Sequence, residues 1–178
     1  MKLGLAHDEV RLENFTTAWS EEFERVKAEI MRNVDVEANQ IEHIGSTAIT
    51  DMPAKPIIDM VIGIDDVHQI EKSVINGLKE SGFLRLRVER PEEVVFATFT
   101  DDTFQVKTHY VHLVSYQEEL WQNLIFFRDY LNAHQAARVA YEKIKRDYVQ
   151  HSMTGIKDYT DHKEAFVKAI YQQRSQAE

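Results

Sequence analysis

The stretch Ile41-Glu42-His43-Ile44-Gly45-Ser46-Thr47, followed by Ile57-Ile58-Asp59-Met60-Val61-Ile62, decides the fold. A short apolar segment ends in Gly45-Ser46, and a second apolar segment carries one acid, Asp59. An acid inside an apolar strand is costly to bury, so Asp59 needs a cation, a metal or a hydrogen-bond partner, or it must face a cleft. A Gly-Ser turn between a strand and a helix offers backbone N–H groups and a hydroxyl, which suit a phosphate. Together these features predict a phosphate site beside a strand carboxylate.

Longer motifs around these residues resemble those of the GrpB family. They are Glu42-His43-Ile44-Gly45-Ser46-Thr47-Ala48, Ala54-Lys55-Pro56-Ile57-Ile58-Asp59, Thr108-His109-Tyr110-Val111-His112-Leu113-Val114, Phe127-Arg128-Asp129-Tyr130-Leu131, and an ending with Tyr159, Lys163 and Phe166-Val167. The resemblance extends from Val10 to Ile170. It implies a fold of the nucleotidyltransferase superfamily. The family is also found fused to dephospho-CoA kinase, so the resemblance implies the fold more directly than the function.

Composition bounds the class of protein. The chain has 178 residues, 43% of them hydrophobic, with a net charge of −9 and a pI of about 5.4. This length and apolar content predict a single domain over residues 1–178 with its own core. The acidity argues against general nucleic-acid binding, which uses basic stripes, although a nucleotide needs only a local basic patch. The lack of cysteine excludes disulfides, Cys-based zinc sites and thiol catalysis.

Membrane and export signals are not evident in the sequence. No segment approaches the roughly 18 consecutive apolar residues of a membrane span. Residues 1–10 lack the apolar centre of a secretion signal. We therefore expect no membrane partner and a cytoplasmic location, while the oligomeric state is not readable from the sequence.

Residue periodicity in the first two thirds predicts a mixture of helices and strands. Apolar residues at helical spacing predict a helix over 17–33. They predict a second helix that is capped by Asp65 or Asp66 and ends at Gly82. Its buried residues would be Val67, Ile70, Val74 and Leu78. Segments rich in β-branched and aromatic residues predict strands over 40–44, 57–64, 83–88, 94–99 and 104–114.

The last third predicts helices alone. A capping box at Ser115–Glu118 opens a helix whose apolar stripe is Leu120, Leu124, Phe127 and Leu131. The next stripe is Ala136, Ala140, Ile144 and Tyr148, with Lys143, Lys145 and Arg146 on a solvated face. Phe166 and Ile170 anchor a final helix after a loop over 153–158. The predicted class is α+β, a nucleotidyltransferase-like mixed sheet flanked by N- and C-terminal helices.

The resemblance implies a metal site at Asp59, which corresponds to the first metal-binding acid of the superfamily. The usual pattern is acid-x-acid on one strand, with two Mg²⁺ ions that activate the attacking oxygen and steady the leaving phosphate. This chain has Val61 at the second position. Glu42, Asp51 or a later acid would have to substitute. We expect Mg²⁺ or another divalent cation, held by Asp59, Glu42 and His112.

Two pairs of polar strand residues are predicted to divide between the faces of the sheet. His109 and His112 lie three apart on one strand, so they point to opposite faces. The family more often has His-x-His here, and Tyr110 stands at the first of those positions. We therefore place His112 in the cleft and His109 outside it, the alternative for His112 being a histidine bonded to backbone. His43 and Glu42 also point to opposite faces.

The predicted phosphate-binding residues are Gly45, Ser46, Thr47, Lys55 and Arg128. Backbone N–H groups and the Ser46 hydroxyl would hold phosphate oxygens. Lys55 stands between two prolines on a rigid segment that can aim its ammonium, and the alternative is a solvated loop lysine. Arg128 would clamp a phosphate, or it forms an ion pair that ties helices to the sheet.

Two functions of different classes follow. The leading one is binding of a nucleotide or another phosphorylated small molecule, with weak metal-dependent nucleotidyl transfer in which Asp59 and His112 are catalytic. The alternative is a non-catalytic interaction or folding-assistance module derived from the same fold. The Gly45-Ser46 turn with Asp59 favours the first, and Val61 favours the second.

Overall fold

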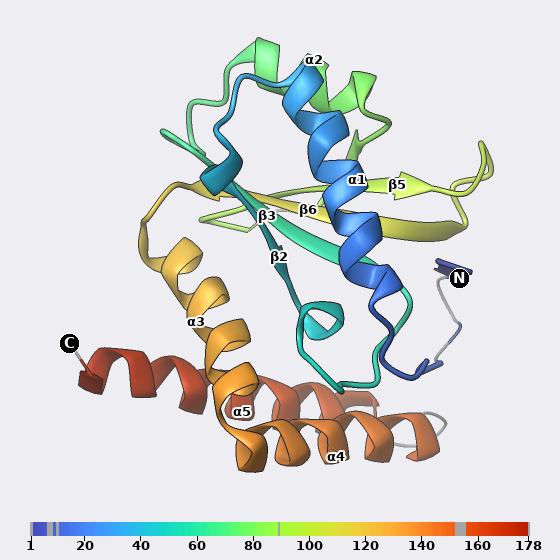
Figure 1. The fold of residues 1–178 in the computed structure, drawn as a ribbon, viewed down its shortest axis with the longest axis vertical. Helices are drawn as coiled ribbons and strands as arrows, with labels where there is room; N and C mark the ends of the chain where they lie inside the picture. Colours follow the sequence, from blue (N-terminus) through green and yellow to red (C-terminus); the bar gives the residue numbers. More distant parts are fainter. Residues whose placement is uncertain (1, 7–8, 10, 89, 152–155, 178) are drawn as a thin grey trace.

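The computed structural model describes residues 2–6, 9, 11–88, 90–151 and 156–177. Within these residues the chain forms one mixed sheet and five α-helices (Figure 1). The strands are β1 (Leu5–Ala6), β2 (Ile41–Ile44), β3 (Ile58–Ile64), β4 (Leu84–Arg85), β5 (Val94–Phe99) and β6 (Val106–Ser115). The helices are α1 (Ala18–Asn33), α2 (Lys72–Glu80), α3 (Glu119–Ala133), α4 (Gln135–His151) and α5 (Ile156–Ala177).

The strand order is β2-β3-β6-β5-β4, with β1 paired to β6. β3 and β6 are parallel, and the other pairs are antiparallel. The predicted α+β class with a mixed sheet and terminal helices is therefore confirmed. A short 3₁₀ helix, Ser46–Ala48, follows β2 directly.

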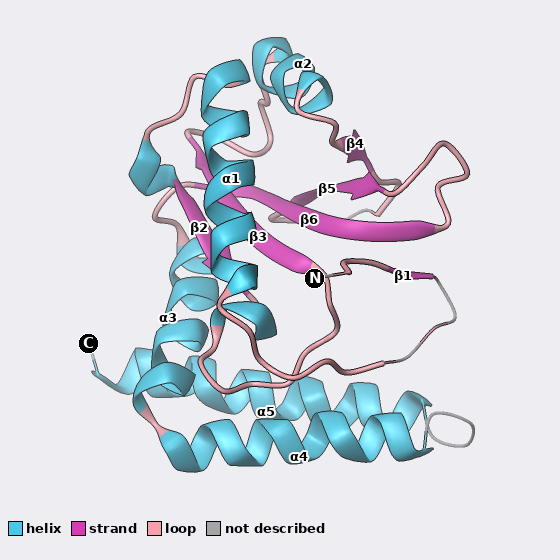
Figure 2. Ribbon diagram, turned by 45° about the vertical axis from the view of Figure 1, so that its right-hand side comes forward, coloured by secondary structure: helices cyan, strands magenta, loops and turns pink. Residues whose placement is uncertain are grey.

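Helices cover both faces of the sheet. Helices α1 and α2 pack on one face, where Trp19, Phe23, Val26 and Ile30 are buried as predicted. Helix α3 packs on the other face, where Trp121 lies against Val61. Helices α4 and α5 lie side by side across one end of the sheet in both ribbon views (Figure 2). They bury a second core against the segment that links β2 to β3.

The register of the central strands decides which polar residues share a face. Ile44 pairs with Asp59, and Asp59 pairs with Tyr110. Glu42 pairs with Val61, and Val61 pairs with His112. Because paired residues point to the same side of a sheet, these polar residues all lie on the α3 face. The predicted division holds, since His43 and His109 lie on the α1 face.

Several predicted boundaries are wrong for identifiable reasons. Helix α2 begins at Lys72, because Asp66 instead closes a turn by accepting the His68 N–H at 2.8 Å. The Ser115 hydroxyl accepts the Val67 N–H at 3.0 Å and does not cap α3, which begins at Glu119. Strand β4 is two residues long. The predicted loop over 153–158 lies partly outside the described residues, and its last three residues belong to α5.

The sequence also predicted the wrong buried face for α4. Tyr141 and Lys145 are buried, whereas Ala136 and Ala140 are exposed. The predicted solvated face therefore holds for Lys143 and is wrong for Lys145, which is 5% exposed. No helix in the described part of the chain has the length and apolar character needed to cross a membrane.

Candidate functional site

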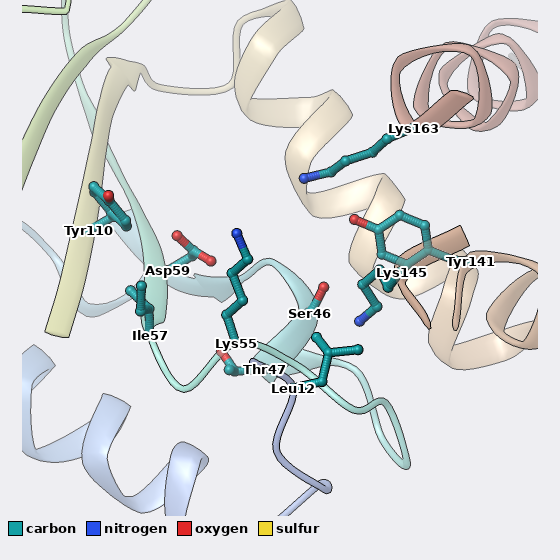
Figure 3. Close-up of a pocket in the computed structure, with 10 residues that line it drawn as sticks. All are labelled: Leu12, Ser46, Thr47, Lys55, Ile57, Asp59, Tyr110, Tyr141, Lys145 and Lys163. Carbon is teal, nitrogen blue, oxygen red and sulfur yellow. The ribbon is translucent and has the colours of Figure 1, made fainter. Parts of the chain in front are cut away.

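A cavity of about 180 Å³ opens where the sheet meets α4 and α5 (Figure 3). It lies at the N-terminal end of β3, beside the Ser46–Ala48 turn. Segments far apart in the sequence form its wall. The lining residues are Leu12, Ser46, Thr47, Lys55, Ile57, Asp59, Tyr110, Tyr141, Lys145 and Lys163.

Gly45 brings the turn after β2 into contact with Asp59. Its φ is +71°, a conformation that L side chains rarely adopt. A Cβ added at this position would lie 2.6 Å from Asp59 Oδ2. Glycine is therefore needed both for the backbone conformation and for the close approach to the carboxylate. The result is that Ser46 and Asp59 line the same cavity, as the sequence predicts.

Lysines from three segments surround the cavity. Figure 3 shows Lys55 from the loop before β3 and Lys163 from α5 pointing into the space between Asp59 and Ser46. Lys145 lies on α4, and its ammonium donates to the carbonyl oxygen of Pro53 at 2.5 Å. Burial, reinforced by the charge of Lys163, lowers the pKa of Lys145 to about 7. The same two causes lower the pKa of Lys55.

Two tyrosines complete the wall. Burial raises the pKa of Tyr141 to about 12, although the Ser46 hydroxyl acts in the opposite direction. Burial and the charge of Asp59 raise the pKa of Tyr110, which lies beside Asp59 in the register. Both phenols are therefore protonated at neutral pH and can donate hydrogen bonds to an anion.

His112 lies between two carboxylates. Its Nδ1 is 2.8 Å from Glu93 Oε2, and its Nε2 is 3.7 Å from Asp59 Oδ1. Glu93 is 8% exposed and also pairs with Arg90. Burial alone would lower the pKa of His112, but the two carboxylates outweigh it and raise that pKa to about 9. The ring is therefore an imidazolium at neutral pH, with both nitrogens as donors.

The other two strand histidines lie away from the cavity. His43 stacks on Phe23 with ring centroids 4.9 Å apart, and its Nε2 is 2.9 Å from Thr47 Oγ1. Burial lowers the pKa of His43 to about 4, so it is neutral. His109 lies 3.1 Å from Glu22 on α1, and burial lowers its pKa as well. Both belong to the α1 side of the sheet.

Arg128 forms an ion pair between helix and sheet, which was the alternative to a phosphate clamp. Its Nη1 donates to Glu42 Oε2 at 2.5 Å and to the carbonyl oxygen of His43 at 2.9 Å, and its Nε donates to Asp129 at 2.7 Å. The side chain thus ties α3 to β2 and does not line the cavity. Thr47 lines the cavity, although its hydroxyl contacts His43.

The residues predicted to hold a metal are not brought together as a group. Across the described ranges, no three His, Asp or Glu side chains are arranged to bind a metal ion. Glu42 is paired with Arg128, and both nitrogens of His112 face carboxylates. Val61, at the second acid position, is fully buried in the apolar core against Trp121. Asp59 remains the carboxylate that faces the cavity.

The sequence matches a known protein family over most of its length. The model of the family described as GrpB protein matches residues 9–173. The chain belongs to the GrpB family. It is 36% identical over 169 residues to the Glutamate-rich protein GrpB of Alkalihalophilus pseudofirmus, covering 94% of this chain and 97% of that protein. It is 28% identical to a UPF0157 protein of Streptomyces coelicolor, covering 91% of this chain and 82% of that protein.

A solved GrpB structure has the same fold as this chain. The crystal structure of the conserved protein GrpB from Enterococcus faecalis superposes with a TM-score of 0.70 at 23% identity, covering 94% of this chain and all of that one. A cytoplasmic RNA terminal U-transferase gives a TM-score of 0.46 at 12% identity, covering 74% of this chain and 38% of that one. The match to the GrpB structure shows the fold of this chain.

Sequence reasoning missed the contribution of the C-terminal helices to this GrpB site. Tyr141 and Lys145 are four residues apart, so they share one helical face with Tyr148. That spacing was a usable signal, because the helical face of Tyr141 and Tyr148 matches the buried side of α4 better than the face of Ala136 and Ala140 does. Lys163 belongs to one of the motifs of the GrpB resemblance but was not assigned to the site. Glu93 carried no comparable local signal, since its partner His112 is 19 residues away in the sequence.

Proposed function

We propose that the cavity binds the phosphate of a nucleotide or of another phosphorylated small molecule. The observation that carries this proposal is the convergence of Lys55, Lys145 and Lys163 with the Ser46 hydroxyl around one cavity. The chain has a net charge of −9, so this local gathering of cations departs from its overall acidity. Basic groups concentrated in a concave site attract anions more strongly than the same groups spread over a surface.

Each polar group has a definable role in such binding. The Ser46 hydroxyl and the ammonium groups of Lys55 and Lys163 would donate to phosphate oxygens. Tyr141 keeps its proton and would add a neutral donor. Asp59 repels a phosphate at short range, so it would face the rest of the ligand and accept a hydrogen bond from a hydroxyl group there.

Metal-dependent transfer through this cavity is expected to be weak. Two-metal catalysis needs carboxylates that bridge and hold both ions. Asp59 lies in the cavity, but Val61 is buried, Glu42 is bound to Arg128, and His112 is held between carboxylates. These residues do not fit a resident Mg²⁺ pair. A single cation carried in on nucleotide phosphates would meet one protein carboxylate.

A non-catalytic interaction or folding-assistance role is the second candidate. The observation that favours it is the state of His112, whose Nδ1 is hydrogen-bonded to Glu93 and whose Nε2 lies 3.7 Å from Asp59, so that the ring is held as an imidazolium. A charged imidazolium cannot act as a general base. A binding measurement distinguishes the two candidate functions, because an interaction or folding-assistance module needs no small phosphorylated ligand.

Calorimetric titration with a panel of nucleotides, phosphorylated sugars and inorganic phosphate, with and without Mg²⁺, tests the proposal. The matched variants are Lys163→Ala, in the cavity wall, and Lys168→Ala, an exposed lysine of the same helix. A charge-assisted hydrogen bond contributes about 1.5–3 kcal/mol, so Lys163→Ala should weaken binding by roughly tenfold or more. Lys168→Ala should change it little. Equal effects of the two variants, or no binding by the wild type, would contradict the proposal.

A further inference from the structure

We infer that Lys145 is a nucleophilic lysine, which forms an imine with a small phosphorylated aldehyde or ketone bound in the cavity. This inference rests on the proposed phosphate site, since the other lysines of that site would hold the phosphate. It assigns to this chain a covalent chemistry that needs neither a metal nor a second carboxylate.

The environment of Lys145 differs from that of an ordinary surface lysine. The residue is 5% exposed and lies in the cavity wall. Its ammonium donates to the neutral carbonyl oxygen of Pro53, and its Nζ lies 5.1 Å from the ring centroid of Tyr141. Lysines become nucleophilic when they are desolvated or placed beside another cation. Lys145 meets both conditions, because Lys163 lines the same cavity.

The protonation state agrees with this geometry. Burial and Lys163 lower the pKa of Lys145 to about 7, and the charge of Arg146 acts in the same direction while that of Glu142 opposes them. About half of the Lys145 side chains are then neutral at pH 7, against roughly one in 2,500 for an ordinary lysine. A neutral amine can keep one N–H on the Pro53 carbonyl while its lone pair attacks a carbonyl group.

The chemical step balances without a further reactant. The lone pair of Nζ adds to the carbonyl carbon, and a proton moves from nitrogen to oxygen to give a carbinolamine. Loss of one water then forms the C=N bond, so each imine releases one water. The protonated Tyr141 lines the same cavity and can donate a hydrogen bond to the departing oxygen. Lys55 and Lys163 remain for the phosphate.

Reductive trapping tests the inference. The wild type is incubated at pH 7 with glyceraldehyde 3-phosphate and cyanoborohydride, and the modified lysines are mapped by peptide mass spectrometry. Lys143, exposed on the same helix, is the internal control. Because Lys145 is desolvated beside Lys163, it should be modified at least tenfold faster than the exposed Lys143. Its rate should reach half of its maximum near pH 7, and unphosphorylated glyceraldehyde should react more slowly.

Two comparisons separate this inference from the phosphate site. Lys145→Arg keeps a cation but cannot form an imine, so the fast modification should disappear while Lys143→Arg leaves it unchanged. Modification spread evenly over exposed lysines, or inorganic phosphate that binds by calorimetry while Lys145 stays unmodified, would overturn the nucleophilic lysine alone. Fast modification of Lys145 that inorganic phosphate does not slow would support the nucleophile and contradict the phosphate site.

Discussion

The contacts of His112 predict how its titration responds to mutation of each carboxylate. Nδ1 lies 2.8 Å from Glu93, which is hydrogen-bond length, and Nε2 lies 3.7 Å from Asp59, which is too long for a direct hydrogen bond. The Glu93 side chain is 8% exposed and that of Asp59 is 32% exposed. Glu93→Gln should therefore lower the pKa of His112 from about 9 by more than Asp59→Asn does.

The sizes of the two shifts follow from these contacts. A hydrogen bond to a charged group is worth about 1.5–3 kcal/mol, and one pKa unit corresponds to about 1.4 kcal/mol. Loss of the Glu93 charge should therefore lower the pKa of His112 by about 1–2 units. A solvent-screened ion pair contributes about 1 kcal/mol or less, so loss of the Asp59 charge should lower it by less than about 1 unit.

The assay is an NMR titration of the histidine ring nitrogens in the wild type and both variants, with His112→Gln used to assign the signal. The pKa values of His43 and His109 should not change in Glu93→Gln, because these rings lie on the other face of the sheet. A wild-type His112 that titrates near 6.5, or a larger shift in Asp59→Asn than in Glu93→Gln, would refute the reasoning.

Three further predictions follow from the same site. Because the folded-state pKa of His112 is raised to about 9, its ion pairs stabilise the fold fully below pH 6.5. Urea unfolding should show that up to about 3 kcal/mol of the free energy of unfolding is lost as the pH rises through 9. The dependence of this free energy on pH should be flatter in His112→Gln. Gly45→Ala should lower the free energy of unfolding by about 1–3 kcal/mol in the same assay, since its φ is +71° and its Cβ would meet Asp59; an unchanged midpoint would show that the turn relaxes freely. Nucleotidyl transfer assayed with Mg²⁺ or Mn²⁺ should be slow or absent where binding persists, and brisk transfer abolished by Asp59→Asn would show that another acid completes the site.

Strand alternation and helical spacing predicted the parts of the molecule that obey simple periodicity. The buried stripe of α1 and the opposite faces of His109 and His112 follow from side-chain direction alone. The proximity of Ser46 to Asp59 was also predictable, because Ser46 lies just after β2 and Asp59 lies on β3, which pairs with β2. These features depend on neighbours in sequence or on adjacent strands.

Features that depend on long-range packing could not be predicted in this way. Lys145 was assigned to a solvated face because lysine is rarely buried, yet α4 packs against the segment containing Pro53, far earlier in the chain. Arg128 had two predicted roles, a phosphate clamp or an ion pair between helix and sheet, and the structure pairs it with Glu42 and Asp129. Ser115 matched a capping motif, but tertiary contact with Val67 took its hydroxyl.

A crystal structure of the protein grown with saturating inorganic phosphate would show directly whether the cavity binds phosphate. Phosphate density is expected in the cavity, within hydrogen-bond distance of Ser46 Oγ and Lys163 Nζ. Phosphate bound at another surface while this cavity holds none would contradict the account.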